Sequence, residues 1–579
     1  MILQALYEYY QRNKDSLPAI GFQEQEIKFI VIIDKKGVFL DLQDTREGRR
    51  GKKYQLPKSV IRSGSNSWQS VNLLWDHYGY LFAQPKDETP KSVDLAKKQM
   101  GTFLKSLETL PKQVREDDGV NAVVLFYSND EWKNVMVHPL WTECIKIPGC
   151  NITFRLDGDD YLIPQRDAVK MYQLSKPAET ESQAEDDGRS SSVESICLIT
   201  GKRGVVARLH TPTPIINARS NAKIVAFQKS SGFDSYLKEQ AFNSPVCCEA
   251  EASYSTALKY LISSNKNQIR VGEDTILFWS QKGTTDNIFD FEADFSWYFK
   301  NSKDDPDRGI KAVKGLYEAM YSGRIPADEG HRFYVLGLAP NRARISVRFW
   351  KTGSIHSFAE KIVSHFDDFS IDGGSNEPDY LSLYQILSAT ALEYKMDNVP
   401  PNLASRVVES ILDGSPYPAT LMQQCIRRIR AERSVNRARA AILKAYLNRF
   451  NRIHNRNERE VQMSLDRNNV NVGYRLGRLF AVLEKIQEEA NPGINATIRD
   501  RFYGAASTSP TSVFPRLLKL KNHHLPKLNP GRQVNMEKEI GEIVDGISGD
   551  LPANMALDEQ THFAVGYYHQ RQDFFRKKD

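Results

Sequence analysis

The spacing of apolar residues changes along this chain, and the change limits the folds that are open to it. Before about residue 380 the apolar residues stand in short runs bounded by polar turns, a pattern typical of strands. From about residue 381 they recur at helical spacing. We therefore predict an α+β protein, with mixed N-terminal and central α/β regions followed by a C-terminal helical bundle.

Several strands can be placed from the apolar runs. Residues 29–33 and 38–42 are predicted to form two strands joined by the turn at 34–37. Residues 120–127 and 333–338 are each a nearly continuous apolar run, which is typical of a buried strand. The clearest helical stripes are those formed by Ile426, Ile429, Ile442, Tyr446, Phe450 and Ile453, and by Tyr474, Leu476, Leu479, Phe480, Leu483 and Ile486.

The length of the chain, 579 residues, exceeds what a single hydrophobic core usually organises. Residues 175–195 are polar, acidic and rich in Ser, without apolar periodicity, which indicates a linker or a long exposed loop. We predict an N-terminal domain at 1–174, a central α/β domain at 196–380 and a helical domain at 381–579.

Positive charge is concentrated in one part of the predicted helical domain. The whole chain carries a net charge of +6, whereas residues 427–459 hold eleven Lys or Arg against two acids, an excess of nine. Like charges at helical spacing repel by roughly 0.2–0.5 kcal/mol per pair, so a polyanion or an acidic partner is expected nearby. The alternative is pairing with acids elsewhere in the chain. The candidate contacts to a nucleic-acid backbone are Arg430, Arg433 and Arg437.

A second basic region lies near the N-terminus. The Gly-punctuated segment 46–53 is suited to follow a phosphate backbone, and the small polar residues at 63–67 allow close approach to a groove. Asn72 stands in an apolar run; its amide can read base edges, or it can bond the backbone of its own turn. The candidate DNA-binding residues here are Arg49, Arg50, Lys52, Lys53, Lys58, Arg62, Ser63, Gly64, Asn66 and Asn72.

A third basic group is predicted on a strand at residues 342–350. Alternation places Ile345, Val347 and Phe349 on one face. The other face carries three candidate contacts to a nucleic-acid backbone: Arg342, Arg344 and Arg348. These arginines either line a channel for nucleic acid or pair with acids of a neighbouring strand.

Motifs of catalysis are missing from the sequence. It contains no G-x-x-x-x-G-K-[ST] phosphate loop, no H-E-x-x-H metal motif and no nucleophile elbow. We therefore predict no catalytic residue, no metal ligand and no cofactor, and hence a protein that is not an enzyme. Two alternatives stay open: a metal-dependent nucleic-acid-processing enzyme with dispersed ligands, and a purely architectural subunit that binds RNA and protein.

The cellular location is predicted to be the cytoplasm. The N-terminus lacks the features of a signal peptide, and no apolar stretch is long enough to span a membrane. The six cysteines form no C-x-x-C pair, which is typical of buried thiols in a reducing compartment.

Several blocks of this sequence, taken together and in order, resemble a known family. The blocks are CLITG at 197–201, residues 226–240 and 243–246, residues 333–350, YRLGRLFA at 474–481, RFYGAAS at 501–507 and residues 566–575. They are spread over residues 197–575 and are similar to the large subunit of the type I-C CRISPR surveillance complex (Cascade).

The resemblance implies a function in antiviral defence. Such a subunit recognises a short protospacer-adjacent motif (PAM) on double-stranded target DNA, while crRNA pairing reads the target itself. It aids duplex opening, stabilises the R-loop and supports recruitment of a separate nuclease-helicase. The implied partners also include crRNA and the backbone, crRNA-processing and small subunits of Cascade.

The resemblance also places two features on the sequence. The stretch from Arg62 to Asp76 is similar to the family's PAM-side loop and strand, which makes Asn72 the first candidate for minor-groove contact. In type I-C systems the small subunit can arise by internal initiation, and Met463 is the start we predict for a separately translated unit at 463–579.

Overall fold

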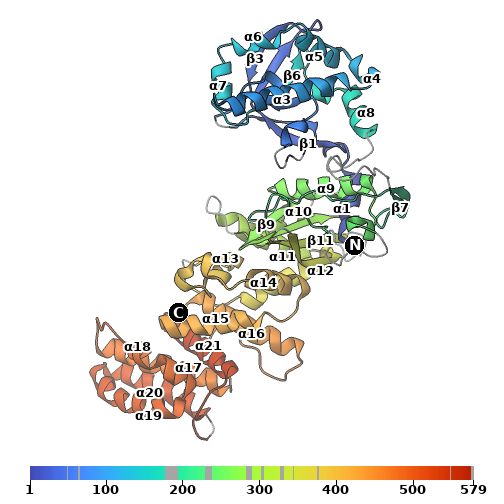
Figure 1. Cartoon of the computed structure of the whole chain (residues 1–579). Coiled ribbons are helices and arrows are strands. Elements are labelled where there is room, and N and C mark those ends of the chain that lie inside the picture. Colours follow the sequence, from blue (N-terminus) through green and yellow to red (C-terminus); the bar gives the residue numbers. More distant parts are fainter. Residues whose placement is uncertain are drawn as a thin grey trace. The chain divides into compact units, whose positions relative to one another are not determined.

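The structure is a computed structural model of residues 1–579, and it divides into two compact units. Unit 1 consists of residues 1–213 and 220–260, and unit 2 of residues 214–219 and 261–579 (Figure 1). The described residues are all except 49, 61, 63–65, 176–192, 229–237, 282–289, 301–305, 326–331, 343, 375–376, 548 and 576–579.

The division into units differs from the domains predicted from composition. Most of the predicted linker at 175–195 lies outside the described residues. The predicted boundary near residue 380 falls inside unit 2, where one hydrophobic core runs from the central sheet into the helical region. These two parts therefore share a core and form one compact unit.

A four-stranded sheet organises the N-terminal part of unit 1, in the order β3-β2-β6-β5. Its strands are β2 (Phe29–Ile33), β3 (Phe39–Asp44), β5 (Trp75–His77) and β6 (Asn151–Leu156). Strand β2 pairs with β3 antiparallel and with β6 parallel, and it is buried at every position. The predicted hairpin is confirmed: Asp34 Oδ1 accepts from the backbone N–H groups of Lys36 and Val38, each at 2.8 Å.

The prediction of a strand at 120–127 is wrong, because these residues belong to helix α5 (Asp118–Ser128). Asp117 caps the helix by accepting from the backbone N–H groups of Gly119 and Val120. The buried positions follow a helical period, but the partly exposed Val124 and Leu125 are apolar as well, so the sequence shows a nearly continuous apolar run. A short apolar run of this kind has the same sequence pattern as a buried strand.

The rest of unit 1 consists of two β-ribbons and further helices. The ribbons are β1 (Phe22–Ile27) with β4 (Lys52–Pro57), and β7 (Glu194–Ile196) with β8 (Arg203–Val205), both antiparallel. The helices are α1 (Ile2–Arg12), α2 (Tyr78–Phe82), α3 (Pro90–Glu108), α4 (Lys112–Arg115), α6 (Trp132–Met136), α7 (Trp141–Ile145), α8 (Asp167–Ser175) and α9 (Cys248–Ser263), whose last turn enters unit 2.

Unit 2 begins with an antiparallel sheet in the order β12-β11-β10-β9. The strands are β9 (Gln268–Val271), β10 (Asp274–Ser280), β11 (Arg332–Asn341) and β12 (Arg344–Ser354), and the helices beside them are α10 (Phe291–Phe295), α11 (Pro306–Tyr321) and α12 (Ile355–Phe369). A bulge interrupts the pairing of β11 and β12 between Gly337 and Leu338. The predicted alternation is therefore wrong at Val347, which is 41% exposed, while Ile345 and Phe349 are buried.

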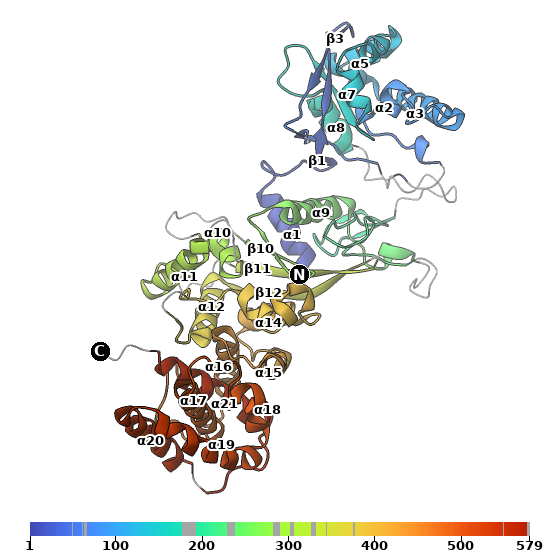
Figure 2. The same ribbon diagram turned by 90° about the vertical axis from the view of Figure 1, so that its left-hand side faces the viewer.

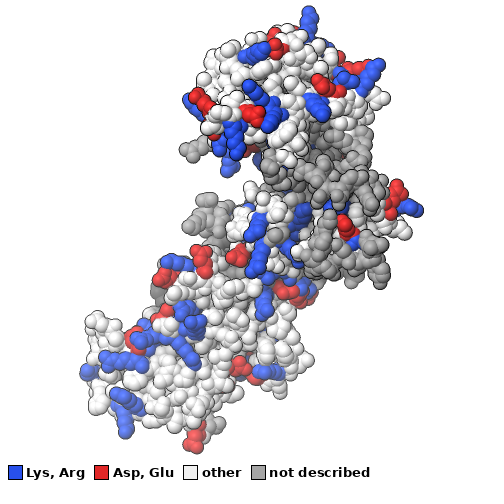
Figure 3. Space-filling view, viewed as in Figure 1, with Lys and Arg blue, Asp and Glu red and all other residues white. Residues whose placement is uncertain are grey.

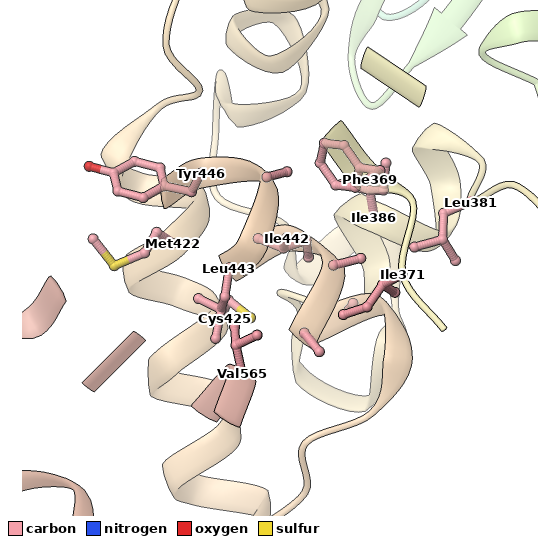
Figure 4. Packing of buried hydrophobic residues seen from close by; sticks show 14 of the residues in the cluster. Phe369, Ile371, Leu381, Ile386, Met422, Cys425, Ile442, Leu443, Tyr446 and Val565 are labelled. Atoms are coloured by element: carbon pink, nitrogen blue, oxygen red, sulfur yellow. The ribbon is translucent and has the colours of Figure 1, made fainter. Parts of the chain in front are cut away.

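The predicted C-terminal helical region is confirmed. Its helices are α13 (Leu383–Ser388), α14 (Leu403–Asp413), α15 (Ala419–Glu432), α16 (Arg437–Ile453), α17 (Val472–Ala490), α18 (Ile498–Thr508), α19 (Pro510–His524), α20 (Pro530–Asp545) and α21 (Leu557–Asp573). Figure 2 shows α17 to α21 gathered into a bundle. Cys425 of α15, Leu443 of α16 and Val565 of α21 are buried together (Figure 4), which joins the bundle to the helices before it.

Candidate nucleic-acid interface

A loop at residues 58–74 of unit 1 joins β4 to β5, and an arginine closes it. The Arg62 guanidinium stands over the Tyr80 ring at 4.1 Å. It donates from Nη1 to Asp76 Oδ1 at 2.9 Å, from Nη2 to Asp76 Oδ2, and from Nε to the Ser70 carbonyl at 2.8 Å. A bidentate pair of this kind fixes geometry as well as charge, so it holds the two ends of the loop together.

Asp76 is the centre of this arrangement, and its side chain is fully buried. It also accepts from the backbone N–H groups of Asn72 at 3.0 Å and His77 at 2.8 Å. The Tyr80 hydroxyl donates to the Ser67 carbonyl at 3.0 Å, and burial raises the pKa of that phenol. We refer to the four residues that tie the loop as the loop clasp: Arg62, Asn72, Asp76 and Tyr80.

Asn72 has an internal role in this structure. Its side chain is buried, with 4% of the residue exposed, and its Oδ1 accepts from the Val60 backbone N–H at 2.9 Å. The sequence left two alternatives for the Asn72 amide, which were to read base edges or to bond the backbone of its own turn. The geometry matches the second alternative. The structure therefore gives no support to the predicted base contact by Asn72, and it makes Asn72 a residue that positions the loop.

The basic residues around β4 are exposed. The backbone of Arg50 pairs with that of Glu47 in an isolated antiparallel β-bridge. Lys52 and Lys53 begin strand β4 of the β1–β4 ribbon, and both are exposed. Lys53 Nζ lies 2.8 Å from Glu24 Oε2, a pair in which both side chains are about half exposed or more. Exposed pairs contribute roughly 0–1 kcal/mol, so this one can exchange Glu24 for a phosphate at small cost.

The remaining N-terminal candidates have different positions. Arg49, Ser63 and Gly64 lie outside the described residues. Asn66 is exposed at the start of the short turn Ser67–Gln69. Lys58 is half-buried, and its Nζ donates to Thr211 Oγ1 at 3.0 Å.

The arginines predicted on one strand face do not form a continuous row. Arg342 lies in the turn between β11 and β12 with φ of 55°, and Arg344 is exposed at the start of β12. Arg348 lies beside the bulge, and its Nε is 3.5 Å from Asp274 Oδ1 on β10. Burial raises the pKa of Asp274, and Ser405 and Arg348 oppose that shift. Arg348 thus pairs with an acid of the same sheet, although that acid is on β10 and not on β11, the strand next to β12.

The structure gives no support to the prediction that Arg437 contacts a nucleic-acid backbone. Its side chain is buried and donates to the carbonyls of Ile371 at 3.4 Å, Pro378 at 2.5 Å and Asp379 at 3.3 Å. Its Nε also lies 3.6 Å from Glu377 Oε2. The Arg437 guanidinium therefore binds the segment that precedes α13.

Much of the basic segment 427–459 is used in the same way. Arg439 and Arg449 are buried, and they pair with Glu432 and Asp368 respectively. Figure 3 shows Lys and Arg scattered among acids and uncharged residues on the visible face of unit 2, without a continuous basic tract over the described residues there. The excess charge of this segment is therefore mostly an internal pairing network.

Two of the predicted helical arginines stay at the surface. Arg433 ends α15 in the left-handed conformation, with φ of 53°, and is exposed. Arg430 is exposed and donates to Gln560 Oε1 on α21. These two keep a place among the candidates for contact with a polyanion.

Arg437 and Arg433 form a matched pair for a test of this assignment. Arg437→Ala is expected to lower the free energy of unfolding by about 2–3 kcal/mol, because it leaves buried acceptors unsatisfied. Arg433→Ala is expected to change it by less than about 0.5 kcal/mol, as surface substitutions usually do. Thermal and urea unfolding of the two variants measures the difference, and equal melting curves would contradict the structural role of Arg437.

Neither a metal-binding cluster nor a membrane-spanning helix is found among the described residues. Within the described ranges, no group of three or more His, Cys, Asp or Glu is placed to hold a metal ion. In the part of the chain that the structure describes, no helix has the length and apolar character needed to cross a membrane.

Comparison with known proteins places the chain in a family. The family model described as CRISPR-associated protein (Cas_Csd1) matches residues 6–575. The chain therefore belongs to the Csd1 family of CRISPR-associated proteins. A search of curated proteins found no match.

Proposed function

We propose that this Csd1-family protein is the large, non-catalytic subunit of a type I-C Cascade, and that it recognises the PAM on double-stranded DNA. In this role it aids duplex opening, stabilises the R-loop and supports recruitment of a separate nuclease-helicase, while crRNA pairing reads the target. The family match supports the assignment to a CRISPR system.

The observation that carries the proposal is the loop at 58–74. A bidentate pair between the partly exposed Arg62 and the buried Asp76 closes it, and exposed basic residues of β4 flank it. The described loop residues that these bonds already hold lose little conformational entropy on binding, and nearby cations attract the phosphate backbone. In this proposal the loop clasp positions the loop, and the exposed polar residue Asn66 and the basic residues Arg50, Lys52 and Lys53 face the DNA.

The proposal is tested by gel shift of the assembled complex on duplexes with and without the PAM, at two salt concentrations. Both affinities should fall with salt, because phosphate contacts release counterions. A difference of at least tenfold between the duplexes should persist, since each base pair read correctly is worth roughly 1–3 kcal/mol. Equal binding to both duplexes would favour the architectural alternative.

Two further measurements use the same preparations. Incubation of the purified chain with labelled DNA and RNA and Mg²⁺ or Mn²⁺ should give no cleavage, and metal-dependent cleavage would overturn the non-catalytic assignment. Mass spectrometry of the complex should detect a species that begins at Met463, a residue that is 50% exposed. Its absence would count against a separately translated unit at 463–579.

A further inference from the structure

Another basic segment lies in the helical bundle of unit 2, and its charge is arranged differently from that of 427–459. Residues 497–527 include α18 and α19, and they hold six Lys or Arg against one acid, Asp500. This excess of five is close to the net charge of +6 on the whole chain. The two helices pack against each other (Figure 2), so the charge is collected in one part of the bundle.

Most of these cations have no acidic partner. Arg499 Nε lies 3.7 Å from Glu484 Oε1, and Lys521 Nζ lies 3.8 Å from Glu537 Oε1. The other four are exposed and form no ion pair with a carboxylate of the described residues: Arg501, Arg516, Lys519 and Lys527. Unlike the buried arginines of 427–459, these four therefore keep their charge available at the surface.

Helix α19 carries its charged residues on the side away from the core. Its buried side consists of four residues: Pro510, Val513, Phe514 and Leu517. Four exposed polar residues recur at helical spacing and lie in one line along the helix: Ser512, Arg516, Lys519 and His523. At the rise of an α-helix this line is roughly 16 Å long. We refer to these four residues as the α19 stripe.

An aromatic contact holds Arg516 against α18. Its guanidinium carbon lies 5.3 Å from the centroid of the Phe502 ring. A contact of this kind uses the face of the ring, so the N–H groups of Arg516 stay free to donate to a ligand. The single acid of the segment is engaged elsewhere, because Asp500 Oδ2 accepts from the Thr497 backbone N–H at 2.8 Å. The stripe is thus ordered and has no competing acid on its own segment.

We propose that the α19 stripe binds the phosphate backbone of an unpaired DNA strand. Exposed cations without acidic partners attract phosphates, and binding releases the counterions of the strand. A single line of cations suits one strand, whose phosphates follow one another, better than a duplex, whose two backbones are separated by grooves. The proposal rests on the proposed function, because duplex opening is the step that supplies an unpaired strand.

Binding by the stripe is expected to depend on salt and not on the PAM. Each phosphate contact to a single strand adds roughly 0.7 to the slope of log affinity against log salt, so losing one contact costs about fivefold at 0.1 M salt. The full-length chain carrying Lys519→Gln should therefore bind a fluorescent single-stranded DNA oligonucleotide about fivefold more weakly than wild type, and about 25-fold more weakly when Arg516→Gln is added. Fluorescence anisotropy at several salt concentrations measures both quantities.

Lys521→Gln is the matched control, because it makes the same chemical change on the same helix but away from the stripe, where Lys521 pairs with Glu537. The two variants have the same net charge, so a general effect of the protein's field would weaken both equally. Lys521→Gln should keep the affinity and the salt slope of wild type, and thermal unfolding checks that both variants fold. Equal binding by Lys519→Gln and Lys521→Gln would overturn the assignment of the stripe.

The assembled complex identifies which strand is bound. It is given either the PAM-bearing duplex, whose opening displaces one strand, or the bare target strand, which pairs with the crRNA and displaces none. The variant with both Arg516→Gln and Lys519→Gln should bind the duplex at least about fivefold more weakly and the bare strand as wild type does. Equal losses on both substrates would assign the stripe to the crRNA or the target strand and overturn the proposal. A complex that ignores the PAM, although the isolated chain still needs Lys519 to bind single-stranded DNA, overturns only the proposed function.

Discussion

Replacing Asp76 by Ala should abolish the preference of the assembled complex for PAM-bearing DNA while the complex still assembles. The carboxylate is fully buried and receives four hydrogen bonds, two from Arg62 and one each from the backbone of Asn72 and His77. Without it, Arg62 and the Asn72 N–H lose their common acceptor, and the loop at 58–74 loses its closure.

The magnitude follows from the burial of the two partners. Breaking a fully buried ion pair costs about 3–5 kcal/mol. The Arg62 side chain is 22% exposed and regains some water in the variant. We therefore expect Asp76→Ala to lower the free energy that holds the loop in its closed conformation by about 2–3 kcal/mol. A binding loop that must be reordered loses at least about tenfold in affinity, which corresponds to roughly 1.4 kcal/mol.

Glu24→Ala is the matched control, since it removes an acid from the exposed pair with Lys53 in the same unit. It should leave PAM discrimination unchanged. Gel shift of both complexes measures binding, and circular dichroism of both chains checks folding. Wild-type discrimination by a folded Asp76→Ala complex would show that the loop clasp does not serve DNA recognition.

Local patterns in the sequence were sufficient for the parts of the fold that local interactions determine. The hairpin of β2 and β3 follows from two apolar strands and a turn in which Asp34 bonds its own neighbours. The strand predicted at 120–127 failed because the partly exposed positions of α5, Val124 and Leu125, are apolar, so the sequence hides the helical period of its buried residues. The cap at Asp117 was the available signal for a helix.

Charge counting was less informative, because the partners of a charge are distant in sequence. Arg449 pairs with Asp368, 81 positions earlier, and Arg437 binds carbonyls that lie 58 to 66 positions earlier. No local pattern distinguishes such arginines from exposed ones. The clasp residue Asp76 was missed for the same reason, although an acid inside an apolar strand is itself a sign of a buried partner.

Gly477→Ala should strongly destabilise unit 2, because the backbones of α17 and α21 touch at this residue. A Cβ added to Gly477 would lie 2.0 Å from the Phe563 carbonyl oxygen, and one added to Gly566 would lie 2.1 Å from the Tyr474 carbonyl oxygen. The obstructing atoms are backbone, so a side-chain rotation cannot relieve the clash and the helices must separate.

The expected cost of Gly477→Ala is about 3 kcal/mol, the upper part of the range for overpacking. Gly504→Ala in α18 is the control, since its added Cβ meets no atom within 4 Å and Ala favours a helix interior. That variant should be more stable than wild type by roughly 0.5–1 kcal/mol. The melting temperature should therefore fall for Gly477→Ala and rise for Gly504→Ala, although the chemical change is the same. Equal melting temperatures for the two variants would mean that α17 and α21 do not pack backbone to backbone in solution.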